Sequence, residues 1–251
     1  MKNQKTHFGF KEVNYDQKSN LVKNIFSNVA KKYDLMNDLM SAGTHRLWKN
    51  RMINHIDFFD NIQVIDVAGG TGDIAFRIAE NAEKKGLNYH INLADINPKM
   101  LEIGTARAID KNLFSKLNFN ECDGENLPYD NDSFDTYTIA FGIRNFTNIE
   151  NGLREAYRVL KKGGKFICLE FSKVEDIFLQ KIYDIYSFKI IPKIGEIVLK
   201  DNDSYQYLVE SIRKFPNQKV FKKMIEDAGF SNVNFENLTF GVCAIHVAIK
   251  D

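Results

Sequence analysis

The stretch Val64-Ile65-Asp66-Val67-Ala68-Gly69-Gly70-Thr71-Gly72-Asp73 joins an apolar run that ends in an acid to a glycine-rich turn and the start of an apolar helical pattern. Glycines at a strand-to-helix turn allow positive φ angles and let a ligand approach without a Cβ in the way. A second apolar run, Ile91–Ala94, ends in another acid, Asp95, about 20 residues further on, where a nucleotide-type ligand presents its ribose hydroxyls. The arrangement predicts a pocket for a nucleotide-type cofactor.

The acids around this turn discriminate between two kinds of cofactor. Gly70–Ala75 also fits the G-x-G-x-x-A variant of the dinucleotide fingerprint, in which a pyrophosphate rests on the helix N-terminus. Asp66 and Asp73 would repel a pyrophosphate there. S-adenosylmethionine (SAM) has no phosphate, and its cationic sulfonium and ammonium groups are favoured by nearby carboxylates. Each acid also has an ordinary alternative, since Asp73 could complement its helix dipole and Asp95 could belong to a helix start.

The composition is that of an ordinary α/β domain. The chain has 251 residues, of which 44% are hydrophobic and 27% charged, enough for a single core. The net charge of +1 and the pI of about 7.7 provide no basic field, so no nucleic-acid partner is expected. The cysteines, Cys122, Cys168 and Cys243, form no C-x-x-C motif and favour reduced thiols. The five histidines show no zinc spacing, and no metal is expected.

No targeting or membrane-spanning segment is evident in the sequence. No apolar run approaches the roughly 18 residues needed to cross a bilayer. Residues Met1–Phe8 lack both the apolar core of a secretory signal and the arginine-rich pattern of a transit peptide. We therefore expect a cytoplasmic protein. A place in the mitochondrial matrix would require that a transit peptide has been removed.

The hydrophobic pattern predicts helices first and then alternating strands and helices. Residues Leu21–Asp60 are expected to be helical, and Lys161–Gly164 is expected to stop a helix. The alternation from Ile62 onward predicts a doubly wound, mostly parallel sheet with helices on both faces. The expected strands are Ile62–Val67, Ile91–Ala94, Leu117–Asn120, Thr136–Ala140, Lys165–Phe171, Val233–Asn237 and Val242–Ile249. The expected helices between them are Asp73–Lys84, Pro98–Asp110, Glu150–Leu160 and Lys219–Ala228.

One segment, Glu175–Leu199, does not fit the alternation of strands and helices. It is rich in aromatic and aliphatic residues, with Lys181, Lys189 and Lys193 interleaved. It could be an insertion helix that packs on the core. We favour a cover over a hydrophobic substrate, with lysines that can touch a membrane surface, because ligands in such folds bind outside the carboxyl ends of the strands.

Several segments resemble a known family. The core resembles class I SAM-dependent methyltransferases, which have a seven-stranded sheet with one antiparallel strand. More narrowly, the whole chain resembles the ubiquinone/menaquinone biosynthesis C-methyltransferases. The matching segments are Thr6–Phe10, Val29–Asp38, His45–Lys49, Phe141–Asn145, Leu169–Ser172 and Tyr183–Phe188. We expect a single domain with an N-terminal helical region (1–60), a donor-binding core (61–172), a helical substrate cover (173–215) and a C-terminal helix and strand pair (216–251).

The resemblance implies which residues bind the donor. It places Thr71 in the glycine turn, Asp95 on the ribose and Asp123-Gly124 near the adenine. Family members often have serine at the position of Ala140, so only a backbone contact with the donor is expected there. Together with the acids and glycines of the turn, the expected donor-binding residues are Asp66, Gly70, Thr71, Gly72, Asp95, Asp123, Gly124 and Ala140.

The resemblance also implies methyl transfer to a ring carbon of a polyprenylated quinol, either demethylmenaquinol or 2-methoxy-6-polyprenyl-1,4-benzoquinol. Such a carbon becomes nucleophilic when an adjacent phenolic hydroxyl ionises, so the site needs positioning, proton removal and stabilisation of the phenolate. Arg144 stays protonated and is expected to stabilise the phenolate. Asn145 is expected beside it, and Tyr33 and His45 as orienting groups or bases. Each could instead be structural: Arg144 in a salt bridge, Tyr33 in the core, His45 at a helix start.

Other functions fit the sequence less well. A methyltransferase acting on nucleic-acid amino groups usually has an Asn/Asp-Pro-Pro-aromatic turn where this chain has Phe141-Gly142-Ile143-Arg144. Asp66 and Asp73 argue against a hydride-transferring dehydrogenase. A methyltransferase for another small aromatic acceptor and a non-catalytic donor-binding subunit remain as alternatives. Beyond the quinol substrate, the partners we expect are a membrane surface and either a second copy of the chain or a quinone-biosynthesis complex.

Overall fold

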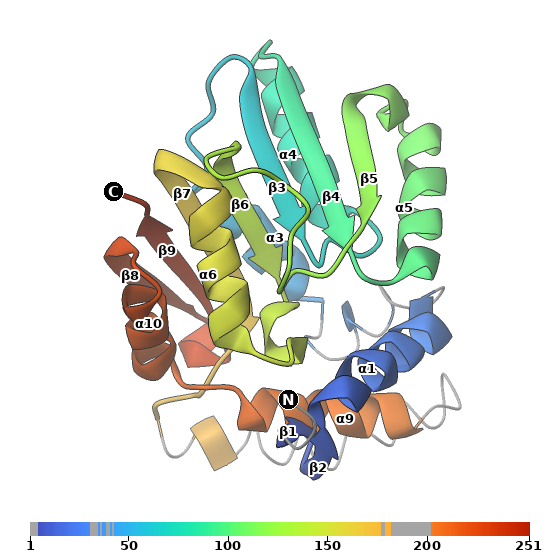
Figure 1. Ribbon diagram of the computed structural model, residues 1–251, viewed down its shortest axis with the longest axis vertical. Helices are drawn as coiled ribbons and strands as arrows, with labels where there is room; N and C mark the ends of the chain where they lie inside the picture. Colours follow the sequence, from blue (N-terminus) through green and yellow to red (C-terminus); the bar gives the residue numbers. More distant parts are fainter. Residues whose placement is uncertain are drawn as a thin grey trace.

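The core of the molecule is a seven-stranded sheet in the order β5-β4-β3-β6-β7-β9-β8 (Figure 1). The structure is a computed structural model that describes residues 5–30, 35, 37, 38, 41, 43–176, 179–181 and 202–251. The five strands from β5 to β7 are parallel, whereas β9 is antiparallel to both β7 and β8. The strands are β3 (Ile62–Val67), β4 (Tyr89–Asp95), β5 (Leu117–Glu121), β6 (Phe134–Ala140), β7 (Leu160–Phe171), β8 (Ser231–Leu238) and β9 (Cys243–Ile249). The predicted fold class is confirmed.

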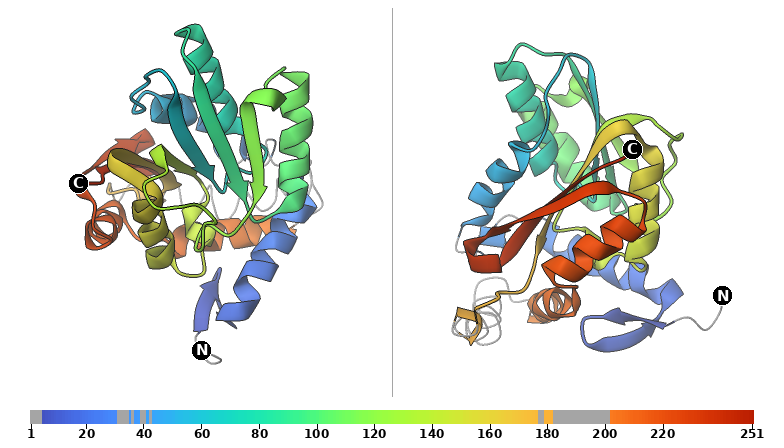
Figure 2. Two further views of the ribbon diagram at one scale, coloured as in Figure 1. Left: turned by 45° about the horizontal axis from the view of Figure 1, so that its top comes forward. Right: turned by 90° about the vertical axis from the view of Figure 1, so that its left-hand side faces the viewer.

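Helices cover both faces of this sheet, as a parallel sheet requires (Figures 1 and 2). One face packs against α3 (His45–Ile53), α4 (Asp73–Lys84) and α5 (Pro98–Asp110). The opposite face packs against α6 (Ile149–Val159) and α10 (Gln218–Asp227). Strand β3 is buried on both sides, which explains why its residues other than Gln63 and Asp66 are all isoleucine or valine.

The N-terminal region differs from the prediction of a purely helical segment. It begins with an antiparallel hairpin of β1 (Lys5–Phe8) and β2 (Lys11–Asn14), followed by α1 (Tyr15–Val29). Residues 54–60, which were expected to be helical, lie outside the regular helices. The hairpin turns at Gly9, whose φ of +60° suits glycine.

The helix before the stop signal at residues 161–164 ends within one residue of its predicted end, but the strand that follows begins five residues earlier than the expected Lys165. Helix α6 ends at Val159, and β7 begins with Leu160, which is buried and pairs with Phe134 of β6. The lysine-glycine stretch therefore forms the exposed start of a strand. Gly163 takes a φ of +76° there, next to a register shift in the ladder between β6 and β7.

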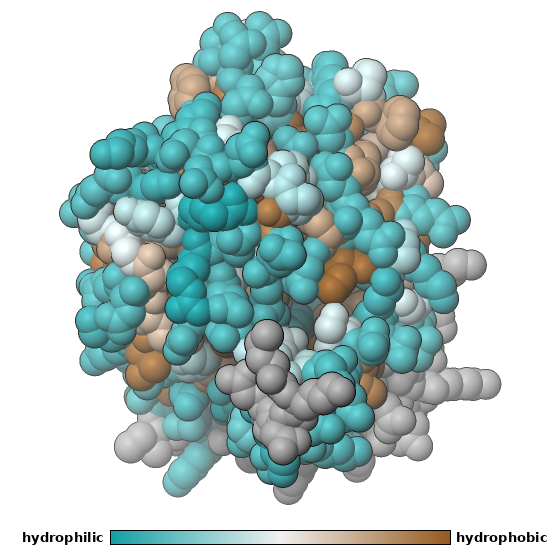
Figure 3. Space-filling view, viewed as in Figure 1, coloured by the Kyte–Doolittle hydropathy of each residue, from teal (hydrophilic) through white to brown (hydrophobic). Residues whose placement is uncertain are grey.

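Helix α9 (Asn202–Lys214) lies beside α1 and the hairpin, below the carboxyl ends of the parallel strands in Figure 1. Figure 2 shows the same grouping from two other sides. Most of the predicted cover, residues 177–178 and 182–201, lies outside the described residues. In the part of the chain that is described, no helix is long and apolar enough to span a membrane. The face in Figure 3 is mainly hydrophilic, with scattered hydrophobic side chains.

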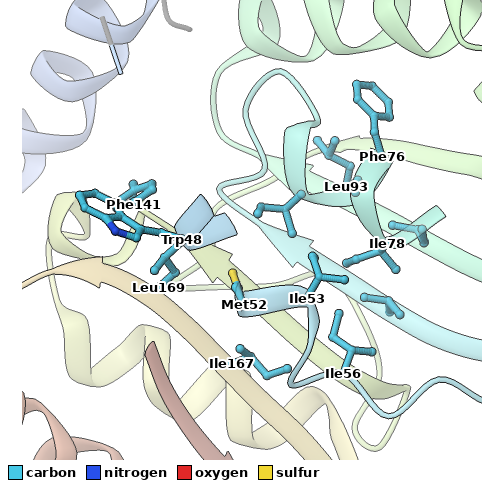
Figure 4. Packing of buried hydrophobic residues seen from close by; sticks show 14 of the residues in the cluster. Trp48, Met52, Ile53, Ile56, Phe76, Ile78, Leu93, Phe141, Ile167 and Leu169 are labelled. Atoms are coloured by element: carbon cyan, nitrogen blue, oxygen red, sulfur yellow. The ribbon is translucent and has the colours of Figure 1, made fainter. Parts of the chain in front are cut away.

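Helix α3 is fixed to the sheet by Trp48. Its indole lies 6.4 Å from the ring of Phe141 and 6.0 Å from that of Phe171, measured between ring centroids. Figure 4 shows Trp48 beside Phe141 and Leu169, with Met52 and Ile53 continuing the contact along the sheet. Trp48 Nε1 also donates a hydrogen bond of 2.9 Å to Thr239 Oγ1, in the short turn η5 (Thr239–Gly241). The helix is thus held firmly at the carboxyl edge of the strands.

Candidate active site

The glycine-rich turn connects β3 to α4 and is held by Asp95 at the end of β4. The backbone N–H of Gly70 donates to Asp95 Oδ2 at 2.9 Å, and that of Asn97 donates to Oδ1 at 2.8 Å. Gly70 and Gly72 have φ angles of +56° and +88°, which few other residues adopt without strain. Burial raises the pKa of Asp95 to about 6, and both amides act against this shift.

A cavity opens at this edge of the sheet and gathers four of the eight expected donor-binding residues. Gly70 and Asp95 border it on one side, and Asp123 and Gly124, after β5, on another. Gly124 leaves no room for a side chain, because a Cβ there would lie 2.5 Å from the ring of Phe146. Asn145 lines the same cavity, and α1 closes it from outside.

A second, smaller cavity continues from the first behind the glycine turn. The two share Ala68, Gly70 and Phe141. The smaller cavity is also lined by Asp66, Thr71 and Ala140, three of the expected donor-binding residues, and by Lys49 and Asp73. The donor-binding expectation for these residues stays a prediction, although they do lie together.

One carboxylate oxygen of Asp66 can still accept a hydrogen bond. Its Oδ1 accepts a hydrogen bond of 2.8 Å from Thr138 Oγ1. The buried Oδ2 accepts no well-aligned hydrogen bond among the described residues, although the backbone amide of Ala75 is near enough to the carboxylate to act against the rise of its pKa. Burial is the largest cause that raises the pKa of Asp66 to about 7, and the charges of Asp73 and Asp95 add to the rise. A buried acceptor without a partner is costly, and a bound ammonium would satisfy it.

Asp73, by contrast, is already paired with cations. Its Oδ2 lies 2.7 Å from Lys49 Nζ, and its Oδ1 lies 3.2 Å from Arg77 Nε. Although burial opposes ionisation, the cations, Lys49 first, keep the pKa of Asp73 below its usual value. Its charge is therefore offset within the protein. Of the two acids that favour a cationic ligand in the sequence, Asp66 is the one with an oxygen still to be satisfied.

The raised pKa of Asp66 leads to a pH prediction. Asp66 is neutral below pH about 7 and ionised above it, and only the ionised form attracts a cation. Affinity for SAM should therefore rise as the pH increases from about 5.5 to about 7, before the donor's own α-amino group begins to titrate. Calorimetry in buffers with different ionisation heats should detect proton release on binding. Asp66→Asn should bind more weakly and lose most of this proton release, and an unchanged release in that variant would contradict the assignment.

Arg144 and Glu170 form a buried ion pair beside the first cavity. In the short helix η3 (Ile143–Asn145), Arg144 Nη1 lies 2.9 Å from Glu170 Oε1, and the two side chains are 3% and 1% exposed. Arg144 also donates to the carbonyl of Phe141, whereas its Nε is buried without a partner among the described residues. Burial raises the pKa of Glu170, and the guanidinium opposes the rise.

Asn145 joins this pair to α9 and to the donor cavity. Its Oδ1 accepts a hydrogen bond of 3.0 Å from the hydroxyl of Tyr207. Tyr207 is a buried phenol whose pKa is raised by burial, so it stays protonated as a donor. Arg144 and Tyr207 together border a further cavity, under the β1–β2 hairpin. Arg144 and Asn145 thus occupy the wall between two cavities.

Two of the expected site residues, His45 and Gly72, are not brought to these cavities. His45 is buried on α3, with Nε2 2.8 Å from Asp38 Oδ1, and lines none of the three cavities that the described residues form here. Burial is the main cause that lowers the pKa of His45, and Lys49 adds to it. Gly72 borders none of them either and starts α4. Tyr33 lies outside the described residues.

Sequence reasoning did not assign Lys49, Glu170 or Tyr207. Lys49 and Glu170 stand within segments that carry the family resemblance, which was a usable signal. Tyr207 carried no such signal. Among the described residues, no group of three or more His, Cys, Asp or Glu side chains could hold a metal ion.

The fold is that of the class I SAM-dependent methyltransferases. A solved SAM-dependent methyltransferase of Thermotoga maritima has the same fold, with a TM-score of 0.62 at 18% identity, over 91% of this chain and 99% of that one. The chain belongs to the ubiE/COQ5 methyltransferase family, whose model matches residues 12–250. It is 53% identical over 245 residues to the ubiquinone/menaquinone biosynthesis C-methyltransferase UbiE of Rickettsia bellii, covering 98% of both chains. It is 52% identical to the UbiE of Rickettsia akari, over 97% of this chain and 98% of that relative.

Proposed function

We propose that the protein transfers the methyl group of SAM to a ring carbon of a polyprenylated quinol in the synthesis of ubiquinone, menaquinone or both. The observation that carries this proposal is the similarity along the whole chain to relatives named for that reaction. The geometry supports it, because two adjoining cavities, one lined by the buried Asp95 and the other by the buried Asp66, meet the Arg144–Asn145 segment at one edge of the sheet.

The donor's cationic groups and its nucleoside fit different parts of the site. Bound SAM supplies an electrophilic methyl group, which needs no base to activate it. Asp95 can accept from ribose hydroxyls with its remaining lone pairs, since a carboxylate has about four acceptor positions and two are taken by amides. Asp66 offers its free Oδ2 to a cation. Gly124 and Asp123 border the cavity where the adenine is expected, and the ring of Phe146 packs directly against Gly124.

Arg144 supplies positive charge where a phenolate would form. The ion pair with Glu170 fixes the guanidinium and leaves Nε as a buried donor. Positive charge that is already oriented stabilises a developing anion without reorganisation at the moment of reaction. Asn145, held by Tyr207, is placed to orient the acceptor ring against the donor. The proton acceptor is assigned to a water molecule, because guanidinium does not release its protons.

The polyprenyl tail has an apolar route at the same edge. Phe240 is 76% exposed in η5, and Leu47 is 67% exposed at the start of α3. The hydrogen bond between Trp48 and Thr239 joins these two elements. The turn lies at the carboxyl end of β7, because Cys243 pairs with Phe171. We propose that the tail leaves the site past these side chains, toward a membrane surface.

A labelled-methyl assay tests the function directly. Purified protein is incubated with SAM carrying a labelled methyl group and with short-tailed reduced benzoquinol or naphthoquinol. We expect label on a ring carbon of at least one quinol. The matched oxidised quinone should accept none, because it lacks the hydroxyl whose ionisation activates the ring. Label on oxygen, or no transfer by a protein that binds SAM, would overturn the proposal in favour of another acceptor or a donor-binding subunit.

A further inference from the structure

Lys49 is a buried cation to which the proposed reaction gives no role. It lies on α3, and its side chain is 4% exposed. A lysine in such a place needs partners for its ammonium, since an unpaired buried charge is very costly. The ion pair with Asp73, at 2.7 Å, supplies one partner. An ammonium has three N–H donors, so Lys49 can keep Asp73 and still donate to a ligand.

The position of Lys49 points to the donor and not merely to Asp73. Lys49 lines the smaller cavity together with Asp66. This cavity continues the donor cavity behind the glycine turn, because the two share Ala68, Gly70 and Phe141. A ligand whose ribose is held by Asp95 would therefore extend its other end toward α3.

The two charged groups of the smaller cavity match the two ends of an amino acid. Asp66 contributes a carboxyl with an unsatisfied oxygen from β3, and Lys49 contributes an ammonium from α3. An α-amino acid carries an ammonium and a carboxylate on one carbon. It would satisfy both groups at once, each by a charge-assisted hydrogen bond.

We propose that Lys49 binds the α-carboxylate of the methyl donor, while Asp66 binds its α-ammonium. This inference rests on the proposed function, because it assumes SAM as the donor. It makes Lys49 a donor-binding residue that rejects adenosine thioethers without a carboxylate. Asp73 acts as a positioning residue, since it holds the ammonium in place before the donor arrives.

The surroundings of Lys49 are suited to this role. The neighbouring Trp48 is packed on Phe141 and Phe171 and hydrogen-bonded to Thr239, so the backbone of α3 cannot shift easily (Figure 4). Asp73 keeps a second partner, Arg77, when Lys49 turns toward a ligand. A preorganised group loses less entropy on binding than a mobile one.

The carboxylate contact and the ammonium contact can be tested separately with three ligands that carry both charged groups, the ammonium alone, or neither. They are S-adenosylhomocysteine, its decarboxylated form S-adenosyl-3-thiopropylamine, and methylthioadenosine, which lacks both charged groups. Dissociation constants are measured by calorimetry for the wild type, Lys49→Met and Asp66→Asn. No acceptor is present, so the result does not depend on the identity of the quinol.

We expect Lys49→Met to weaken the binding of S-adenosylhomocysteine by at least about tenfold. This is the loss typical of removing a hydrogen bond to a charged group. The affinities for the decarboxylated compound and for methylthioadenosine should change by less than about twofold, which also shows that the pocket is folded. Asp66→Asn should weaken the binding of both compounds that carry the ammonium and leave the affinity for methylthioadenosine unchanged. Lys49→Arg should restore part of the affinity for S-adenosylhomocysteine.

The possible results are distinguishable. The role of Lys49 is overturned if Lys49→Met lowers the affinity for all three ligands equally. It is also overturned if the affinity for S-adenosylhomocysteine does not fall. Should Lys49→Met fail to fold, the paired variant Lys49→Gln/Asp73→Asn removes both charges together, and the same selective loss is expected of it. Failure of the wild type to bind S-adenosylhomocysteine would instead overturn the proposed function.

Discussion

Replacing Arg144 with methionine should lower the turnover number by about a hundredfold to a thousandfold, the range seen when one preorganised donor is removed from a developing oxyanion. The dissociation constant for SAM should stay within about twofold, since Arg144 borders the cavity under the hairpin and not the donor cavity. Methionine fills much of the space of the arginine stem. Glu170 would lose its cation, and its already raised pKa would rise further, so it would be buried as a neutral acid.

Single-turnover methyl transfer and calorimetry with SAM separate these two effects. Arg51→Met is the matched control, because Arg51 forms a surface ion pair with Glu236 away from the site. The control should keep full turnover, since exposed pairs contribute little. A loss of SAM affinity in folded Arg144→Met, with turnover of bound donor unchanged, would make Arg144 a donor-binding residue and refute the phenolate role.

Asp95→Ala should abolish measurable SAM binding and also destabilise the fold. The carboxylate of Asp95 accepts from the backbone amides of Gly70 and Asn97, and the alanine variant leaves both without an acceptor in a buried place. Each orphaned amide costs about 1–3 kcal/mol. In a domain of this size each kcal/mol lowers the melting temperature by about 2–4 °C. The ribose contact is lost as well, so affinity should fall by more than about a hundredfold.

Asp95→Asn distinguishes the two roles of this side chain. Asparagine has one oxygen, so it can accept from one of the two amides only. Its melting temperature should lie between those of the wild type and Asp95→Ala, and calorimetry should show a smaller loss of affinity. Asp57→Ala is the control, since that side chain is 81% exposed. Folded Asp95→Ala that binds SAM as tightly as the wild type would show that Asp95 does not contact the donor.

The main sheet could be predicted closely because its pattern is local. The strand Ile62–Val67 and the helices Asp73–Lys84 and Pro98–Asp110 have the predicted bounds. Long apolar runs with clear glycine and acid boundaries leave little choice to the backbone. The hairpin was missed because its strands have four residues each and no apolar alternation. Tertiary contacts hold it instead, among them the 4.3 Å stack of Phe8 on Tyr207.

The acids of the site could be predicted from the sequence, but the side-chain pairs around them could not. Asp66 and Asp95 end neighbouring parallel strands, so the topology alone brings them to one edge. The other pairs that build the site join distant positions: Lys49 and Asp73 are 24 residues apart, Arg144 and Glu170 are 26 apart, and Asn145 and Tyr207 are 62 apart. No periodicity encodes such pairs. They arise only when helices dock on the finished sheet.

The hairpin at the start of the chain has a consequence for the timing of synthesis. The N–H of Phe10 donates to Glu210, 200 positions later, and Phe8 stacks on Tyr207, which binds Asn145. A lone two-stranded hairpin is marginal in water. At about 5–20 residues per second, its partner helix leaves the ribosome about 10–40 s afterwards. The wall that carries Asn145 is therefore completed only after α9 has been made, and a nascent chain that lacks this helix has no finished catalytic centre.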